Sequence, residues 1–151
     1  MDISQITDYL YVGGLPRAED AQILNDLDVR LVISMVGNIR PDRELSQQPF
    51  RLLWLRTYDS IFTPIPIELL MEGVQAALPV IEEGGRVLAH CAAGRHRGVA
   101  MGAAILIAKG YSAQEASRLL RAQRKVADPN IWYIQARIRQ FERQWGDYAQ
   151  K

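Results

Sequence analysis

The 151-residue sequence contains one cysteine, Cys91, and only two histidines. A lone cysteine excludes an internal disulfide, and a free thiol suits a reducing compartment, so we expect a cytoplasmic protein. No cluster of histidine and acidic residues has metal-ligand spacing, and we therefore expect no metal and no other cofactor.

Long hydrophobic runs and a strong net charge are also missing. The longest apolar segment, residues 99–108, is too short to cross a bilayer, and residues 1–5 lack the basic and apolar parts of a signal peptide. The formal net charge of +1 argues against a nucleic-acid partner. No repeat or linker divides the chain, so we expect one domain over residues 1–151, and no oligomeric state is indicated.

The pattern of apolar residues predicts strands that alternate with helices. Strands are expected at residues 8–12, 29–36, 50–55 and 86–90, and 29–36 is apolar enough to be buried on both faces. Helices are expected at residues 18–27, 67–83, 99–109, 113–125 and 131–148. Pro79 should kink or break the second of these helices, and Ser112 with Glu115 forms a capping box at the start of the fourth.

This order predicts an α/β domain with a mostly parallel central sheet flanked by helices. Ligands of such sheets bind beyond the carboxyl ends of the strands. The strand at 86–90 ends at the cysteine, so we expect the functional site there.

Residues 90–98, HCAAGRHRG, join that strand to the next helix. Successive backbone amides in such a loop can point inward and bind an anion, and the helix N-terminus adds the positive end of its dipole. A thiol in that field ionises more readily, and the guanidinium of Arg97 offers a planar fork for two phosphate oxygens. One loop thus combines a nucleophile with an anion clamp, which suits attack on phosphorus.

The order His90-Cys91, five residues and Arg97, between a strand and a helix, resembles the phosphate loop of cysteine-dependent protein tyrosine phosphatases. The small size and layout resemble the dual-specificity branch. Residues 10–14, 29–36 and 129–148 are also similar to stretches of that branch, so the resemblance covers nearly the whole chain. It implies a dual-specificity-phosphatase-like fold over the single domain.

The resemblance also implies roles for individual residues. Cys91 would be the nucleophile and form a phosphocysteine intermediate, and Arg97 would hold two phosphate oxygens. His90 would support the loop, and Asn130 matches an asparagine that organises the site, although it could equally be a helix N-cap. The residues expected to bind the substrate phosphate are Ala92, Ala93, Gly94, Arg95, His96, Arg97 and Gly98.

A general acid is needed to protonate the leaving oxygen. We predict that Asp59 supplies this proton, since it lies in a loop after a strand, 32 positions before Cys91 (91 − 59), where the family carries its acid. Asp42, also in a predicted loop, is the rival.

One position departs from the family pattern. Where the family has serine or threonine after the arginine, this chain has Gly98. The missing hydroxyl helps the thiolate leave in the second step, so we expect slow hydrolysis of the phosphoenzyme unless another group, such as Ser60, replaces it. Gly98 is also the one feature that favours a non-catalytic phosphate-binding module.

The expected substrates are protein phosphotyrosine and phosphoserine or phosphothreonine. A phosphoinositide or another acidic phospholipid is the alternative, because a basic residue at the position of Arg95 also occurs in lipid-phosphate phosphatases of this superfamily. Arg118, Arg121 and Lys125 recur at helical spacing and form either a basic surface or an ordinary solvated helix face.

Overall fold

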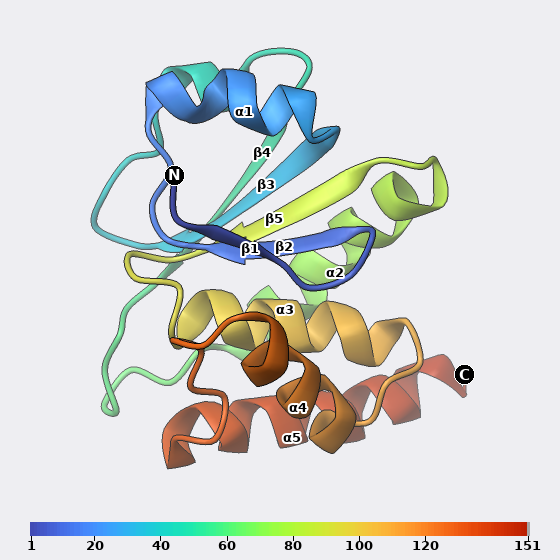
Figure 1. The fold of residues 1–151 in the computed structure, drawn as a ribbon. Coiled ribbons are helices and arrows are strands. Elements are labelled where there is room, and N and C mark those ends of the chain that lie inside the picture. The colour runs from blue at the N-terminus through green and yellow to red at the C-terminus, as the bar shows by residue number, and fades with distance from the viewer. Residues whose placement is uncertain (151) are drawn as a thin grey trace.

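The computed structural model describes residues 1–150 and contains a five-stranded sheet (Figure 1). Its strands lie in the order β1-β2-β5-β3-β4, with β1 antiparallel to β2 and every other neighbouring pair parallel. The predicted mostly parallel sheet is confirmed. The strands are β1 (Ile3–Gln5), β2 (Leu10–Gly13), β3 (Val29–Val36), β4 (Arg51–Thr57) and β5 (Arg86–His90).

Helices cover both faces of the sheet, with α1 on one face and α2 to α5 on the other (Figure 1). The α-helices are α1 (Ala21–Asp26), α2 (Ile67–Glu82), α3 (Arg97–Ala108), α4 (Ala113–Gln123) and α5 (Trp132–Ala149), and short 3-10 helices lie at Ala18–Asp20 and Arg43–Ser46. No helix within residues 1–150 is both long and apolar enough to span a bilayer.

The two faces of β5 contribute to separate apolar clusters. Val87 and Ala89 pack in the larger cluster with α2 to α5, whereas Leu88 packs in the smaller cluster with Leu24 of α1. This alternation follows from the twofold period of a strand. Both faces of β5 are therefore buried, and its carboxyl end is held firmly at the centre of the sheet.

Helix α3 continues directly from the loop that follows β5. Every residue from Arg97 to Ile107 is buried, because α3 lies between the sheet and the outer helices (Figure 1). Gly110, with a φ of 109°, ends the helix as predicted. The element that carries the site is thus the least solvent-exposed helix of the fold.

Two local predictions meet different outcomes. The capping box is confirmed, because Ser112 and Glu115 exchange side-chain to backbone hydrogen bonds. The predicted break at Pro79 is wrong, because α2 runs through this residue to Glu82. Pro79 removes only one hydrogen bond near the end of the helix, and Ala77 just before it is buried in the core. Strand β1 was not predicted, and Lys151 lies outside the described residues.

Candidate active site

The loop of residues 91–96 connects β5 to α3 at the carboxyl edge of the sheet (Figure 1). Each carbonyl oxygen from Cys91 to Arg95 has a hydrogen-bond partner outside the loop. The pairs are Cys91 O with His90 Nδ1 (3.4 Å), Ala92 O with Leu15 N (3.2 Å), Ala93 O with Arg124 Nη2 (3.1 Å), Gly94 O with Arg124 Nε (2.8 Å) and Arg95 O with Asp128 N (2.9 Å).

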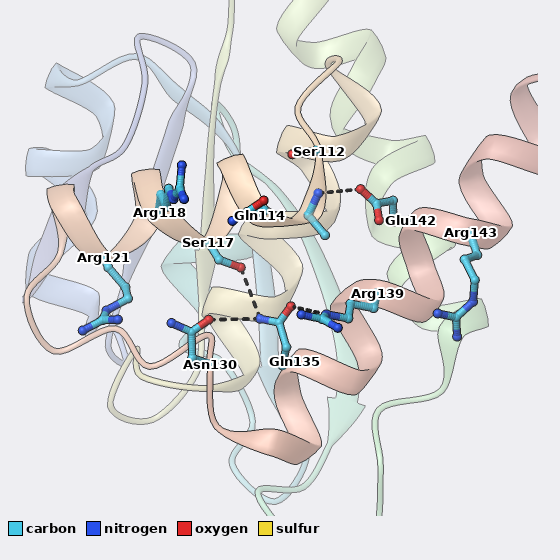
Figure 2. Close-up of a pocket in the computed structure, with 11 residues that line it drawn as sticks. Ser112, Gln114, Ser117, Arg118, Arg121, Asn130, Gln135, Arg139, Glu142 and Arg143 are labelled. Carbon is cyan, nitrogen blue, oxygen red and sulfur yellow. Dashed lines mark hydrogen bonds between the residues drawn. The ribbon is translucent and has the colours of Figure 1, made fainter.

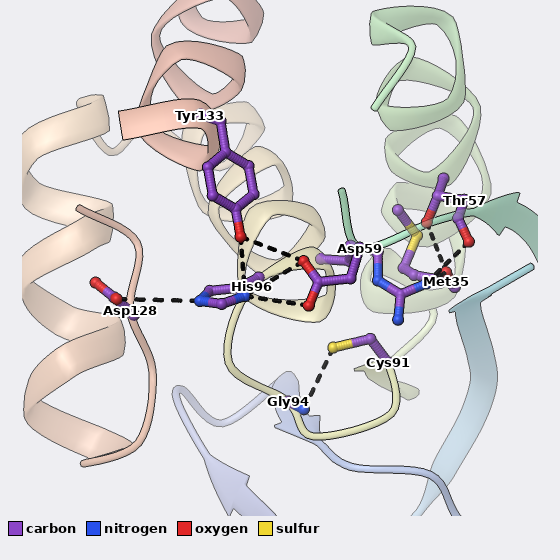
Figure 3. A network of polar contacts seen from close by, with 9 residues as sticks. Met35, Thr57, Asp59, Cys91, Gly94, His96, Asp128 and Tyr133 are labelled. Atoms are coloured by element: carbon purple, nitrogen blue, oxygen red, sulfur yellow. Dashed lines mark hydrogen bonds and ion pairs between the residues drawn. The ribbon is translucent and has the colours of Figure 1, made fainter. Parts of the chain in front are cut away.

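The loop amides face the opposite side from these carbonyls. In a trans peptide the N–H points away from the C=O, so five outward carbonyls turn the following five N–H groups inward. Gly94 N donates to Cys91 Sγ at 3.2 Å (Figure 3), while the amides of Ala92, Ala93, Arg95 and His96 have no acceptor within residues 1–150. The inward amides and the first turn of α3 form an anion-binding cradle around the thiol.

Gly94 is required by the tight turn of this cradle. Its φ is 66°, a conformation that other residues rarely adopt. A Cβ atom there would also lie 2.5 Å from Arg124 Nη2 and 2.7 Å from the Gly13 carbonyl oxygen.

Arg124 is the functional residue that sequence reasoning missed. Its guanidinium is 2% exposed and donates to the two loop carbonyls on one side and to Asp2 and Ser4 on the other. The hydrogen bond from Arg124 lowers the pKa of Asp2, so this carboxylate stays ionised. Arg124 thereby ties the cradle to β1 and the residue before it.

Arg97 is also buried, and the ends of two strands hold it. Its Nη1 donates to the carbonyl oxygens of Met35 and Thr57, each at 2.9 Å (dashed lines in Figure 3). These two carbonyls lie close together because β3 and β4 pair in parallel. Its Nε is buried without a partner among the described residues. Leaving a buried donor unpaired is costly, so an oxygen ligand at this point would satisfy it.

His90 is fully buried at the end of β5. Burial lowers the pKa of its imidazole from 6.5 to about 4, opposed by the contact with the Cys91 carbonyl and aided by the nearby charge of Arg97. Because that carbonyl can only accept, the contact requires the hydrogen on Nδ1. His90 is therefore a neutral donor that supports the loop.

Asp59 lies in the loop after β4 and reaches the cysteine loop through His96. The Nδ1 atom of His96 is 3.4 Å from both carboxylate oxygens of Asp59, and Tyr133 Oη donates to Oδ1 at 3.4 Å (Figure 3). Burial and then the negative charge of Asp59 raise the pKa of Tyr133, so the hydroxyl remains a donor. Asp128 contacts the other side of His96 at 4.0 Å.

Two other predicted residues lie elsewhere. Asp42 accepts a hydrogen bond from Ala18 N and has none from the cysteine loop, so the structure brings Asp59 and not its rival to the site. Asn130 accepts from Gln135 Nε2 and has no hydrogen bond to the loop among the described residues. The N-cap of α5 is Ile131, so the N-cap alternative for Asn130 is wrong.

Gly98 marks a close approach between α3 and β5. A Cβ atom there would lie 3.1 to 3.2 Å from backbone atoms of His90 and Cys91. Ser60 borders a small pocket with Asp59 and Arg97. Within residues 1–150 no group of three histidine, cysteine or acidic side chains is arranged to hold a metal ion.

Comparisons with known proteins agree on one family. A family model described as "Dual specificity phosphatase, catalytic domain" matches residues 10–144. The chain is 31% identical over 133 residues to Protein-tyrosine-phosphatase MKP1 and 27% identical over 132 residues to Dual specificity protein phosphatase 1, both of Arabidopsis thaliana. These matches cover 87% of this chain but 17% and 65% of the two relatives, so the chain spans less than two thirds of either.

Solved structures resemble the whole described fold. PTPMT1 superposes with a TM-score of 0.86 at 26% identity, over 97% of this chain and 98% of that chain. The structure of PTPMT1 in complex with PI(5)P also gives a TM-score of 0.86, at 25% identity and with the same coverage.

Replacing Arg124 should weaken anion binding. Arg124→Met removes the donors to the carbonyls of Ala93 and Gly94, and we expect it to weaken binding of inorganic phosphate about tenfold or more in isothermal titration calorimetry. Asp2→Asn is the control, because it leaves both loop hydrogen bonds in place and should change binding about twofold at most. A folded Arg124→Met protein with the affinity of the wild type would contradict the role given to Arg124.

The buried imidazole should give a pH dependence to stability. His90 binds a proton near pH 6.5 in the unfolded chain and only near pH 4 in the folded chain. Its contribution to the free energy of unfolding is therefore full above pH 6.5 and is lost as the pH falls towards 4. The loss in the free energy of unfolding is about 3 kcal/mol, measurable by urea denaturation, and His90→Asn should abolish it. In the His96→Gln variant only the imidazole of His90 remains, and its nuclear magnetic resonance signal should not titrate between about pH 5.5 and 8. A titration midpoint near 6.5 would refute the lowered pKa of His90.

Proposed function

The chain belongs to the dual specificity phosphatase family, and we propose that it hydrolyses phosphomonoesters through a phosphocysteine intermediate. The observation that carries the proposal is the cradle: inward amides surround a thiol, and a buried arginine beside them has a donor without a partner. We also propose that residues 1–151 form one catalytic domain.

The first step transfers the phosphoryl group to the enzyme. The thiolate of Cys91 attacks phosphorus, the P–O bond to the leaving group breaks, and Asp59 gives its proton to the departing oxygen. Arg97 and the loop amides hold the equatorial oxygens of the phosphoryl group, where charge increases in the transition state. Tyr133 and His96 position the Asp59 side chain, because both contact its carboxylate.

The second step returns the enzyme to its starting state. A water molecule gives a proton to the Asp59 carboxylate and attacks phosphorus, and the S–P bond breaks to release phosphate and the thiolate. Gly98 offers no hydroxyl to the leaving sulfur. Ser60 is a candidate to replace it, since it borders the same pocket as Arg97 and Asp59.

We propose protein phosphotyrosine, phosphoserine and phosphothreonine as substrates, in keeping with the names of the curated relatives. An acidic phospholipid or phosphoinositide is the second candidate, favoured by the relative solved with PI(5)P and by the exposed Arg95 on the loop. Because Cys91 must stay reduced to react, we propose the cytoplasm as the place of action.

Phosphate release from three substrate classes tests the function. Wild type should hydrolyse phosphotyrosine and phosphoserine/threonine peptides faster than phosphoinositides, and Cys91→Ser should be inactive on all of them. Asp59→Asn should lose about 100-fold or more on phosphoserine peptides, whose alkoxide needs a proton, and much less on an aryl phosphate with an acidic leaving group. Activity that survives in Cys91→Ser would exclude the mechanism, and preference for phosphoinositides would select the second candidate.

Rapid-mixing kinetics test the second step. Wild type should release a burst of aryl product, about one equivalent per enzyme, and then turn over slowly because the phosphoenzyme hydrolyses slowly. Gly98→Ser should speed the slow phase relative to Gly98→Ala, the matched control, because both variants add the same close Cβ atom and only serine adds a hydroxyl. A wild-type trace that is linear from the first turnover would contradict this prediction.

A further inference from the structure

A basic groove lies between α4 and α5, outside the cysteine loop (Figure 2). Its volume is about 790 Å³, and neither Cys91, Arg97 nor Asp59 lines it. Four arginines lie along it, Arg118 and Arg121 from α4 and Arg139 and Arg143 from α5. Because Arg139 and Arg143 come from a different helix, the basic residues at 118 and 121 belong to a surface that two helices share.

The arginines of this groove outnumber the carboxylates that line it. None of the four arginines forms an ion pair with another residue in the described part of the chain. Glu142 is the only acidic lining residue, and its carboxylate already accepts a hydrogen bond from Ala113 N at 2.6 Å. The lining thus carries four positive charges against one negative charge, in a chain whose formal net charge is +1.

The floor of the groove is ordered by hydrogen bonds that join its two walls. Gln135 of α5 donates to Ser117 of α4 at 3.4 Å and to Asn130 at 3.2 Å, and it accepts from Arg139 Nε at 3.1 Å (Figure 2). These contacts orient Arg139 and leave the outer nitrogens of its guanidinium without a protein partner among residues 1–150. The groove is therefore a shaped surface with donors along both sides.

The spacing of the arginines favours an extended occupant. Positions 118 and 121 lie three apart and 139 and 143 four apart, so each wall carries charge over about 5 Å. In Figure 2 the four side chains are spread along the two walls and do not converge on one point, as a single phosphate would require. Successive side chains of an extended peptide point to opposite faces and repeat every ~7 Å on each face, so consecutive acidic residues can meet both walls.

A membrane surface fits the groove less well. Interfacial surfaces combine basic residues with large apolar side chains that enter the lipid. None of the large exposed apolar side chains of the described residues, such as Phe62 and Trp132, lines the groove.

We propose that the groove between α4 and α5 binds an acidic, extended segment of a partner protein. Arginine forms forked hydrogen bonds with carboxylates, which gives direction as well as charge complementarity. The proposal does not depend on phosphatase activity, since the groove shares no residue with the cysteine loop.

Binding of a defined probe tests the proposal. The probe is a fluorescein-labelled peptide of ten consecutive glutamate residues, followed by anisotropy at near-physiological ionic strength. Arg118→Gln/Arg139→Gln should weaken its binding about tenfold. Arg51→Gln/Lys125→Gln removes the same charge from exposed residues outside the groove and should change binding about twofold at most.

Both double variants should keep the thermal midpoint and the aryl phosphatase rate of the wild type, because they alter only exposed side chains away from Cys91. Equal loss in the two variants, or no binding by the wild type, would overturn the proposal. So would anionic vesicles or inorganic phosphate that bind through the groove arginines when the peptide does not.

Discussion

The outward anchoring of the loop carbonyls is the constraint on which the rest of the site depends. A chain segment without regular structure would normally orient its peptide groups in several ways, at a cost in entropy when a ligand fixes them. Here Leu15, Arg124 and Asp128 hold four of the carbonyl oxygens from outside. The amides therefore point at the thiol before any anion arrives.

The parallel sheet supplies the second half of the arrangement. Strands β3, β4 and β5 end at one edge, and their ends provide the carbonyls that hold Arg97, the loop that carries Asp59, and Cys91 itself. Residues more than thirty positions apart thus meet because three strands run in the same direction. The outer helix α5 adds Tyr133, whose hydroxyl contacts both Asp59 and His96.

Local patterns predicted the parts of this site that are local in sequence. The buried strands, the loop around Cys91 and the capping box at Ser112 depend on neighbouring residues, and the structure contains them. Arg124 could not be predicted, because its partners Asp2 and Gly94 lie 122 and 30 positions away and it occurs in a row of basic residues. Strand β1 has only three residues, too few for a periodic pattern.

The close packing of α3 against β5 has a consequence for the end of each reaction cycle. The helix is buried from its first residue, and a Cβ atom at Gly98 would lie 3.1 to 3.2 Å from the strand backbone, so close packing opposes any widening of the cradle. A preformed cradle spends little free energy on ordering when it binds. Free phosphate offers the same oxygens as a phosphate ester, so the proposed phosphatase would be inhibited by its own product, as a consequence of the rigidity of the loop.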